Sequence, residues 1–286
     1  MRAMSVGYQQ LLDATIQHLE GLKARGVKFI SVSPETVAAL GAPRTLPERI
    51  IALPPVSSPA STQNDNAAPP ASLLTAPDRA AKEAAMTELR ARALVCRKCS
   101  HLAASRKNVV FGVGDIHSPL MFVGEAPGAD EDEQGEPFVG KAGQLLTRII
   151  QTMGFARDAV YIANILKCRP DTPGQTKGNR KPEPEEMQTC LPYLLAQLDI
   201  IEPKVIVALG ATAVEGLLGK SGGITRLRGH WQEFRGVPVM PTYHPAYLLR
   251  NQALGEKRKV WEDMLLVLEK LGRPINEKQR NYFLKA

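Results

Sequence analysis

The chain has 286 residues, a hydrophobic fraction of 44%, a formal net charge of +7 and a pI near 9.3. These values fit one folded domain with an extension and exclude a fibrous or wholly disordered chain. No run of about 18 to 20 apolar residues is present to cross a membrane, and the first residues lack a secretory signal pattern. We therefore expect a cytoplasmic protein, and its basic charge permits an anionic partner without requiring one.

The first 80 residues differ in composition from the rest of the chain. Residues 6–22 place leucine and isoleucine at helical spacing, so we expect a helical extension over residues 1–50 that could bind a partner protein. Residues 51–80 are rich in Pro, Ala, Ser and Thr and have few large apolar side chains, which is typical of a flexible linker. The folded domain is predicted over residues 81–286, behind a partly disordered N-terminal extension.

Short apolar runs alternate with helical patterns throughout the predicted domain. The expected strands cover residues 119–123, 160–166 and 204–209 and the end of a β segment over 229–242, and the expected helices cover residues 143–153, 184–198 and 211–218. This alternation favours an α/β fold of three layers, α/β/α, with a central, mainly parallel four-stranded sheet. Such sheets bind ligands at the carboxyl ends of their strands, so we expect the functional residues there.

The chain contains only four cysteines, and all of them lie in the predicted domain. Cys96 and Cys99 form a C-x-x-C pair, Cys168 follows a predicted strand, and Cys190 lies in the next helix. A structural disulfide is not expected in a reducing compartment. Four thiols could simply be buried, but four sulfurs with one close pair also suit tetrahedral zinc or a [4Fe-4S] cluster. We predict a metal site, and the spacing alone does not separate zinc from iron-sulfur.

Four sequence motifs stand at or near the ends of predicted strands. They are GEAPG at residues 124–128, PFVGKAGQLL at 137–146, NILKCRP at 164–170 and HPAYLLR at 244–250. A phosphate-binding loop is not indicated, because the interval from Gly135 to Lys141 is wrong for that motif and Ala142 replaces its Ser or Thr.

In order and spacing, these motifs resemble the family 4 uracil-DNA glycosylases, the iron-sulfur branch of their superfamily, over about residues 88–270. The resemblance implies a monomeric, monofunctional enzyme that hydrolyses the N-glycosidic bond of deoxyuridine in single- or double-stranded DNA and so initiates base excision repair. It also implies a [4Fe-4S] cluster. The cysteines that match the cluster ligands of the family are Cys96, Cys99, Cys168 and Cys190.

The resemblance assigns the uracil-binding residues. Phe138 matches the aromatic residue on which the flipped base stacks, and His244 matches the histidine that donates to uracil O2. Asn164 matches the asparagine that reads the Watson-Crick edge, because an amide can donate to O4 and accept from N3–H at once. Gly124 and Ala126, in the first motif, are expected to line the same pocket.

Bond cleavage leaves negative charge on the departing uracil, so the site must stabilise an anion and place a water molecule. His244 and Asn164 are the expected stabilising residues. The best-known uracil glycosylases orient the water with an aspartate, but Ala126 stands at that position here. The resemblance makes Glu131 the better candidate for this role, with Glu125 nearby and Asn179 as an orienting partner.

DNA binding requires neutralisation of phosphates, for which Arg169, Arg180 and Arg250 are the candidates. Tyr247 and Leu248 are expected to enter the duplex near the flipped base, as apolar wedges do in other base-flipping proteins. On DNA, the protein would be associated with the nucleoid.

Departures from the family pattern bear on the activity. The interval from Cys168 to Cys190 is longer than in compact members, as it is in a related subgroup that traps uracil sites through a histidine in this loop. No histidine is present between these cysteines, which favours turnover over trapping. Two other classes remain open: a DNA-binding iron-sulfur protein with little catalysis and a zinc-ribbon interaction module.

Overall fold

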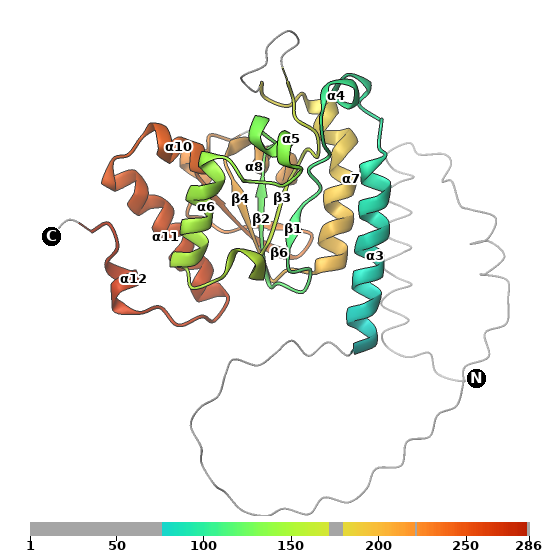
Figure 1. The fold of residues 1–286 in the computed structure, drawn as a ribbon. Helices are drawn as coiled ribbons and strands as arrows, with labels where there is room; N and C mark the ends of the chain where they lie inside the picture. Colours follow the sequence, from blue (N-terminus) through green and yellow to red (C-terminus); the bar gives the residue numbers. More distant parts are fainter. Residues whose placement is uncertain (1–75, 172–179, 221, 285–286) are drawn as a thin grey trace, which may run out of the picture. The chain divides into compact units, whose positions relative to one another are not determined.

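The computed structural model describes residues 76–171, 180–220 and 222–284 (Figure 1). The helical extension expected over residues 1–50 lies outside this part of the chain, and so does the expected linker up to residue 75. Helix α3 (Ala76–Leu94) is the first described element and begins within the range expected for that linker. Among the described residues no helix is both long and apolar enough to cross a membrane.

A single mixed sheet of six strands, in the order β1-β3-β2-β4-β6-β5, forms the centre of the described domain. Its four inner strands are parallel: β2 (Leu120–Gly124), β3 (Tyr161–Asn164), β4 (Val205–Leu209) and β6 (Val237–Thr242). The antiparallel edge strands are β1 (Val113–Gly114) and β5 (Gln232–Phe234). The predicted number of four strands was therefore wrong: β1 is too short to give a sequence signal, and β5 lies within the β segment expected over residues 229–242 but was not counted separately.

The helices that follow α3 cover the sheet or connect its strands. They are α4 (Ser100–Ser105), α5 (Ala129–Gln134), α6 (Lys141–Thr152), α7 (Pro184–Ile201), α8 (Ala211–Leu218), α9 (Ile224–Leu227), α10 (Pro245–Arg250), α11 (Leu254–Lys270) and α12 (Glu277–Asn281), with a 3₁₀ turn at Arg157–Ala159. Local sequence explains where α7 starts. Pro184 occupies its first turn, and the Glu186 carboxylate accepts a 2.8 Å hydrogen bond from the Glu183 N–H.

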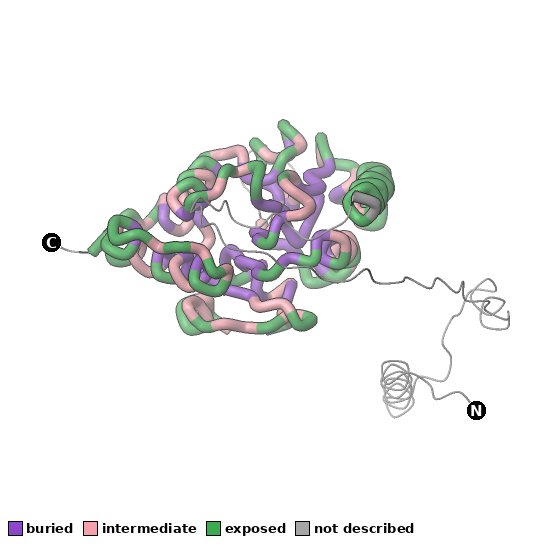
Figure 2. The backbone as a smooth tube through the Cα atoms, turned by 90° about the horizontal axis from the view of Figure 1, so that it is seen from below, coloured by how far each residue is buried: buried purple, intermediate pink, exposed green. Residues whose placement is uncertain are grey.

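Alternate residues of each strand pack against opposite helical layers, as strand geometry requires. Met121 and Val123 belong to a core shared with α3, α7 and α8, whereas Leu120 and Phe122 belong to a core shared with α6 and α11. The two layers lie on either side of the sheet in Figure 1, and Figure 2 shows the buried segments between exposed helical surfaces. The predicted three-layer α/β/α arrangement is confirmed.

The parallel register brings the predicted motifs to one edge of the sheet. Gly124, which ends β2, is the register partner of Asn164, which ends β3, and Leu209 of β4 is the partner of Thr242 of β6. The loops that follow these strands therefore start side by side. Residues 124–128, 164–170 and 244–250 thus share the carboxyl edge at which α/β sheets bind ligands.

Candidate functional site

Gly124, Asn164 and Phe138 are in close contact at the carboxyl edge of the sheet. A Cβ atom at Gly124 would lie 2.3 Å from Asn164 Oδ1 and 2.5 Å from Phe138 Cζ, and both distances are shorter than real carbon contacts. Only glycine therefore lets the asparagine amide and the aromatic ring approach the strand end together. These three predicted uracil-binding residues, far apart in sequence, form one wall.

Phe138 has a left-handed backbone with φ of 55°, which is unusual for a large side chain. Gly143 permits this conformation, because a Cβ atom there would lie 1.8 Å from the Phe138 carbonyl oxygen. The Phe138 ring lies beside the imidazole of His244, with 5.6 Å between ring centroids and an angle of 30° between their planes. The left-handed turn at Phe138 thus brings its ring next to His244, which is also predicted to contact the base.

His244 follows β6 and caps helix α10. Its Nδ1 accepts a 3.1 Å hydrogen bond from the backbone N–H of Ala246, so the proton of the neutral ring resides on Nε2. Burial, together with the charge of Arg250, lowers the pKa of His244 to about 4. At neutral pH the residue is therefore an uncharged imidazole with one N–H donor available to a ligand.

Asn164 is 2% exposed, and within the described part of the chain its Oδ1 atom has no hydrogen-bond partner. A buried polar atom without a partner costs about 1–3 kcal/mol, so such atoms usually mark a site that a ligand completes. A ligand N–H at the face shared with Phe138 would satisfy this oxygen.

A buried polar network behind Asn164 was not predicted from the sequence. Lys167 Nζ donates to the Asn164 carbonyl oxygen at 2.9 Å and to Gln197 Oε1 at 2.6 Å. Gln197 Nε2 in turn donates to the Phe111 carbonyl at 3.0 Å and to the Tyr161 hydroxyl at 2.9 Å. Burial lowers the pKa of Lys167 to about 7. The sequence signal for this network was Lys167 itself, a lysine directly after the apolar residues Ile165 and Leu166.

The Glu131 carboxylate holds together the loop that carries Phe138. It accepts hydrogen bonds of 3.0 Å each from the backbone N–H groups of Gly128, Val139 and Gly140. This anchoring role was not predicted, and placement of a water by Glu131 stays a prediction.

The other residues predicted around the water differ in what surrounds them. Glu125 is half-buried and makes no side-chain hydrogen bond within the described part of the chain, while Ala126 packs against the core. Asn179 lies outside the described residues.

Cys96 follows α3, Cys99 directly precedes α4, Cys168 follows β3, and Cys190 lies in α7. All four are half-buried, and none forms a disulfide. Burial, with smaller contributions from Cys168 and Cys99, raises the pKa of Cys190 to about 11. Burial also raises the pKa of Cys99, as do Cys168, Glu186 and Cys96. The thiols are thus close enough to repel one another when ionised. Within residues 76–171, 180–220 and 222–284, however, no three His, Cys, Asp or Glu side chains are arranged to hold a metal ion.

Two donors point at the cysteine sulfurs from neighbouring segments. Arg106 Nη1 lies 3.0 Å from Cys168 Sγ, and the backbone N–H of Lys167 lies 3.2 Å from Cys190 Sγ. Arg106 also donates to the carbonyl oxygen of Cys96 at 2.7 Å, so it joins two of the cysteine segments. These donors favour sulfur in its anionic form, which is the form that binds a metal.

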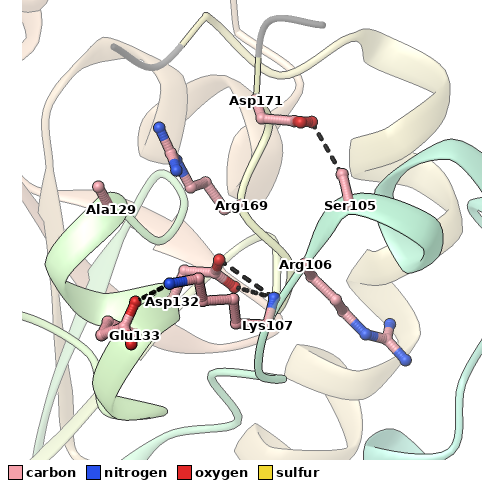
Figure 3. A pocket seen from close by; sticks show the side chains of 8 residues that line it. All are labelled: Ser105, Arg106, Lys107, Ala129, Asp132, Glu133, Arg169 and Asp171. Atoms are coloured by element: carbon pink, nitrogen blue, oxygen red, sulfur yellow. Dashed lines mark hydrogen bonds and ion pairs between the residues drawn. The ribbon is translucent and has the colours of Figure 1, made fainter. Parts of the chain in front are cut away.

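A pocket of about 310 Å³ lies between the end of α4, helix α5 and the chain after Cys168 (Figure 3). Its lining residues are Ser105, Arg106, Lys107, Ala129, Asp132, Glu133, Arg169 and Asp171. Asp132 is 4% exposed and accepts from the backbone N–H groups of Lys107, at 3.0 Å, and Asn108, at 3.2 Å. The predicted DNA-binding residue Arg169 therefore lines a polar depression with charges of both signs.

The other predicted DNA-binding residues differ in accessibility. Arg250 is exposed, and Tyr247 is half-buried with its hydroxyl 3.1 Å from a Glu256 carboxylate oxygen. Leu248 is only 5% exposed and packs in a small core, so its side chain lies inside the domain rather than on its surface. The Arg180 guanidinium donates to the Glu186 carboxylate, at 2.9 Å for Nη1, and to the Asp171 carbonyl at 3.1 Å. Its donors are therefore largely engaged within the protein.

Comparison with known proteins identifies the family. Residues 111–265 match the model of the uracil DNA glycosylase superfamily. The type-4 uracil-DNA glycosylase of Thermotoga maritima is 45% identical over 64% of this chain and 93% of its own. The type-4 uracil-DNA glycosylase of Sulfurisphaera tokodaii is 40% identical over 70% of this chain and 90% of its own. That of Archaeoglobus fulgidus is 41% identical over 66% of this chain and 92% of its own. The chain therefore belongs to the uracil-DNA glycosylase superfamily and, within it, to the type-4 uracil-DNA glycosylases.

Proposed function

We propose that this protein hydrolyses the N-glycosidic bond of deoxyuridine in DNA, releases uracil and leaves an abasic site, which begins base excision repair. Its membership of the type-4 family supports this activity. The observation that carries the proposal is the buried Oδ1 of Asn164, which has no partner within the described residues and lies against Gly124 and Phe138. A flipped uracil presents an N–H group of the kind that this oxygen lacks.

In this mechanism the flipped base stacks on Phe138, and the Asn164 amide accepts from N3–H and donates to O4. Cytosine has an unprotonated N3 and an exocyclic amine, so it offers the opposite pattern to the same amide. As the C1′–N1 bond breaks, its electron pair passes to the base, and charge develops on O2. The Nε2–H of neutral His244 donates to this oxygen and stabilises the leaving anion without transferring a proton.

In this scheme a water molecule forms the C1′–O bond as the C1′–N1 bond breaks, and the proton that the water loses ends on the released uracil. No protein amine attacks C1′, so the proposed enzyme is monofunctional. Glu131 is our candidate for orienting this water. A carboxylate has about four acceptor sites, and three of those on Glu131 are engaged by backbone N–H groups, which leaves one for water. Glu125 is the alternative carboxylate, and Asn179 is the candidate orienting partner.

The chemistry of the cysteines fits a [4Fe-4S] cluster held by Cys96, Cys99, Cys168 and Cys190. Four thiols from four segments influence one another's pKa, and Arg106 and the Lys167 N–H donate toward two of the sulfurs. Such a cluster would supply no chemistry to glycosidic cleavage. It would join the segments after α3 and β3 to α7 and so fix the strand end that carries Asn164.

The proposed substrate is single- or double-stranded DNA that contains uracil, and Arg169 and Arg250 are the candidates for binding its phosphates. Tyr247 and the exposed end of α10 are our candidates for approaching the gap left by the flipped base. The protein would act as a monomer in the cytoplasm, on nucleoid DNA, and its N-terminal extension remains a candidate for binding a partner protein.

The test is to incubate anaerobically purified protein with an end-labelled strand that contains one uracil and then to cleave abasic sites with alkali. We expect cleavage at uracil and none in matched strands that contain cytosine or thymine. Asn164→Ala should abolish most of the activity, whereas Asn281→Ala, at an exposed position of α12, should leave it unchanged. Intact uracil DNA with cluster-loaded protein would refute the activity and favour a protein that only binds DNA.

A further inference from the structure

We infer that Lys167 is a positioning residue for the glycosylase reaction, because its side chain fixes the carbonyl of Asn164 and thereby the amide that reads uracil. This inference rests on the proposed function of Asn164. Nothing in the family resemblance assigned a role to this lysine.

Asn164 is the last residue of β3, where the regular sheet pairing ends. One more backbone hydrogen bond joins this segment to β2, since the N–H of Ile165 donates to the Gly124 carbonyl at 3.0 Å. The Asn164 carbonyl instead receives its donor from Lys167 Nζ at 2.9 Å, three residues further on. This side chain therefore supplies a hydrogen bond at the position where the backbone turns away from the strand.

Lys167 is 2% exposed, and its ammonium group contacts carbonyl oxygens and the Phe111 ring, at 5.9 Å from the ring centroid. Burial of a lysine costs free energy unless its hydrogen bonds are made, so an apolar side chain would suit this position better if only packing mattered. Both the ammonium group and the neutral amine can donate the two observed bonds. The positioning role is thus independent of the protonation state.

Gln197 makes the arrangement rigid from the opposite side. Its Oε1 accepts from Lys167 at 2.6 Å, while its Nε2 is held by the Phe111 carbonyl and the Tyr161 hydroxyl. The lysine is therefore fixed between helix α7 and the end of β3 and cannot follow a displaced strand end. Without it, the Asn164 carbonyl would lose its buried donor and the strand end could move to recruit water.

A displacement of about 1 Å in a reacting group can lower a rate by about 100-fold. We therefore expect Lys167→Met in the full chain to lower the single-turnover rate of uracil excision by about 10- to 100-fold at saturating enzyme. The affinity for uncleaved DNA should change by less than about 2-fold, because phosphate contacts are untouched. Lys204→Met, at an exposed lysine next to β4, is the matched control and should change neither quantity.

The decisive measurement is a double-mutant cycle with Asn164→Ala. If Lys167 acts through the asparagine, Lys167→Met should change the rate by less than about 2-fold once the amide is absent. A loss of the same size in both backgrounds would overturn the inference and leave only a structural role.

Gln197→Met provides a second variant in case Lys167→Met does not fold. It keeps the bond from Lys167 to Asn164 and removes the bonds of Gln197 to Lys167, Phe111 and Tyr161, so we expect a loss of about 3- to 10-fold that again vanishes without the amide. Failure of this coupling would likewise refute the inference. Inactive wild-type protein would refute the proposed function instead, whereas active wild type with a fully active Lys167→Met variant would refute only the role of Lys167.

Discussion

Replacement of His244 by alanine would test the proposed stabilisation of the leaving base. In the proposed mechanism two side chains donate to the uracil anion, His244 through Nε2–H and Asn164 through its amide, so the variant removes one of the two. Loss of one donor to a developing anion costs about 100- to 1,000-fold in kcat, or about 3–4 kcal/mol. His244→Gln, which retains an N–H donor on a side chain of similar reach, should recover part of this loss.

The pH dependence distinguishes a neutral histidine from a cationic one. With a pKa of about 4, about one molecule in a thousand carries a charged His244 at pH 7. Ionisation of this residue should therefore leave the single-turnover rate unchanged between about pH 5 and 8 and lower it as the pH approaches 4. The pKa of His244 in the folded protein, about 4, lies below its unfolded value of about 6.5. Between these two pH values the unfolded chain binds more protons than the folded one, so the free energy of unfolding should fall as the pH decreases from about 6.5 to 4.

The assay is single-turnover cleavage of a uracil oligonucleotide from pH 4.5 to 8.5, with melting measured at each pH. His230→Ala is the matched control, since this histidine is exposed. A wild-type rate that decreases tenfold for each pH unit above about 6.5, and that loses this dependence in His244→Ala, would show a cationic histidine and refute the reasoning.

Three further changes have distinct expected outcomes. Gly124→Ala places a Cβ atom 2.3 Å from the Asn164 amide oxygen, so we expect loss of uracil excision with a melting temperature close to that of wild type; unaltered excision would contradict the contact described for this wall. Cys168→Ala should remove the bound iron and sulfide found by elemental analysis, and stoichiometric zinc in the wild type would instead support the zinc alternative. Arg250→Ala should reduce by about 1 the slope of the logarithm of the DNA association constant against the logarithm of the salt concentration. Arg180→Ala should leave that slope unchanged, because Glu186 engages the donors of Arg180, and equal effects of the two variants would refute this distinction.

The sequence was informative where local patterns determine structure. Apolar, β-branched runs identified the four parallel strands, and the motifs at their ends correctly placed Gly124, Phe138, Asn164 and His244 at one edge. The edge strand β1 was missed because two residues give no periodicity, whereas β5 lies within the β segment expected over residues 229–242 but was not counted as a strand of its own. Their pairing depends on neighbours that are distant along the chain.

Interactions between distant segments could not be predicted from the sequence. Lys167 is one residue before a cysteine in a recognisable motif, but its bond to Gln197 depends on how α7 packs against the sheet. Arg180 was expected to face DNA, and the position of Glu186 one turn into α7 engages it instead. Leu248 was expected to enter the duplex, but its side chain is 5% exposed and packs with Tyr243 and Val260.

The loop that carries Phe138 has a consequence for how the protein would survey undamaged DNA. One carboxylate, that of Glu131, joins Gly128 to Gly140 across this loop, and Phe138 between them adopts a left-handed backbone conformation. If Phe138 stacks on a flipped base as proposed, these contacts place the cost of ordering the loop in folding rather than in each encounter with DNA. A scanning enzyme of this kind would reject cytosine through its opposite hydrogen-bond pattern without first having to order the loop.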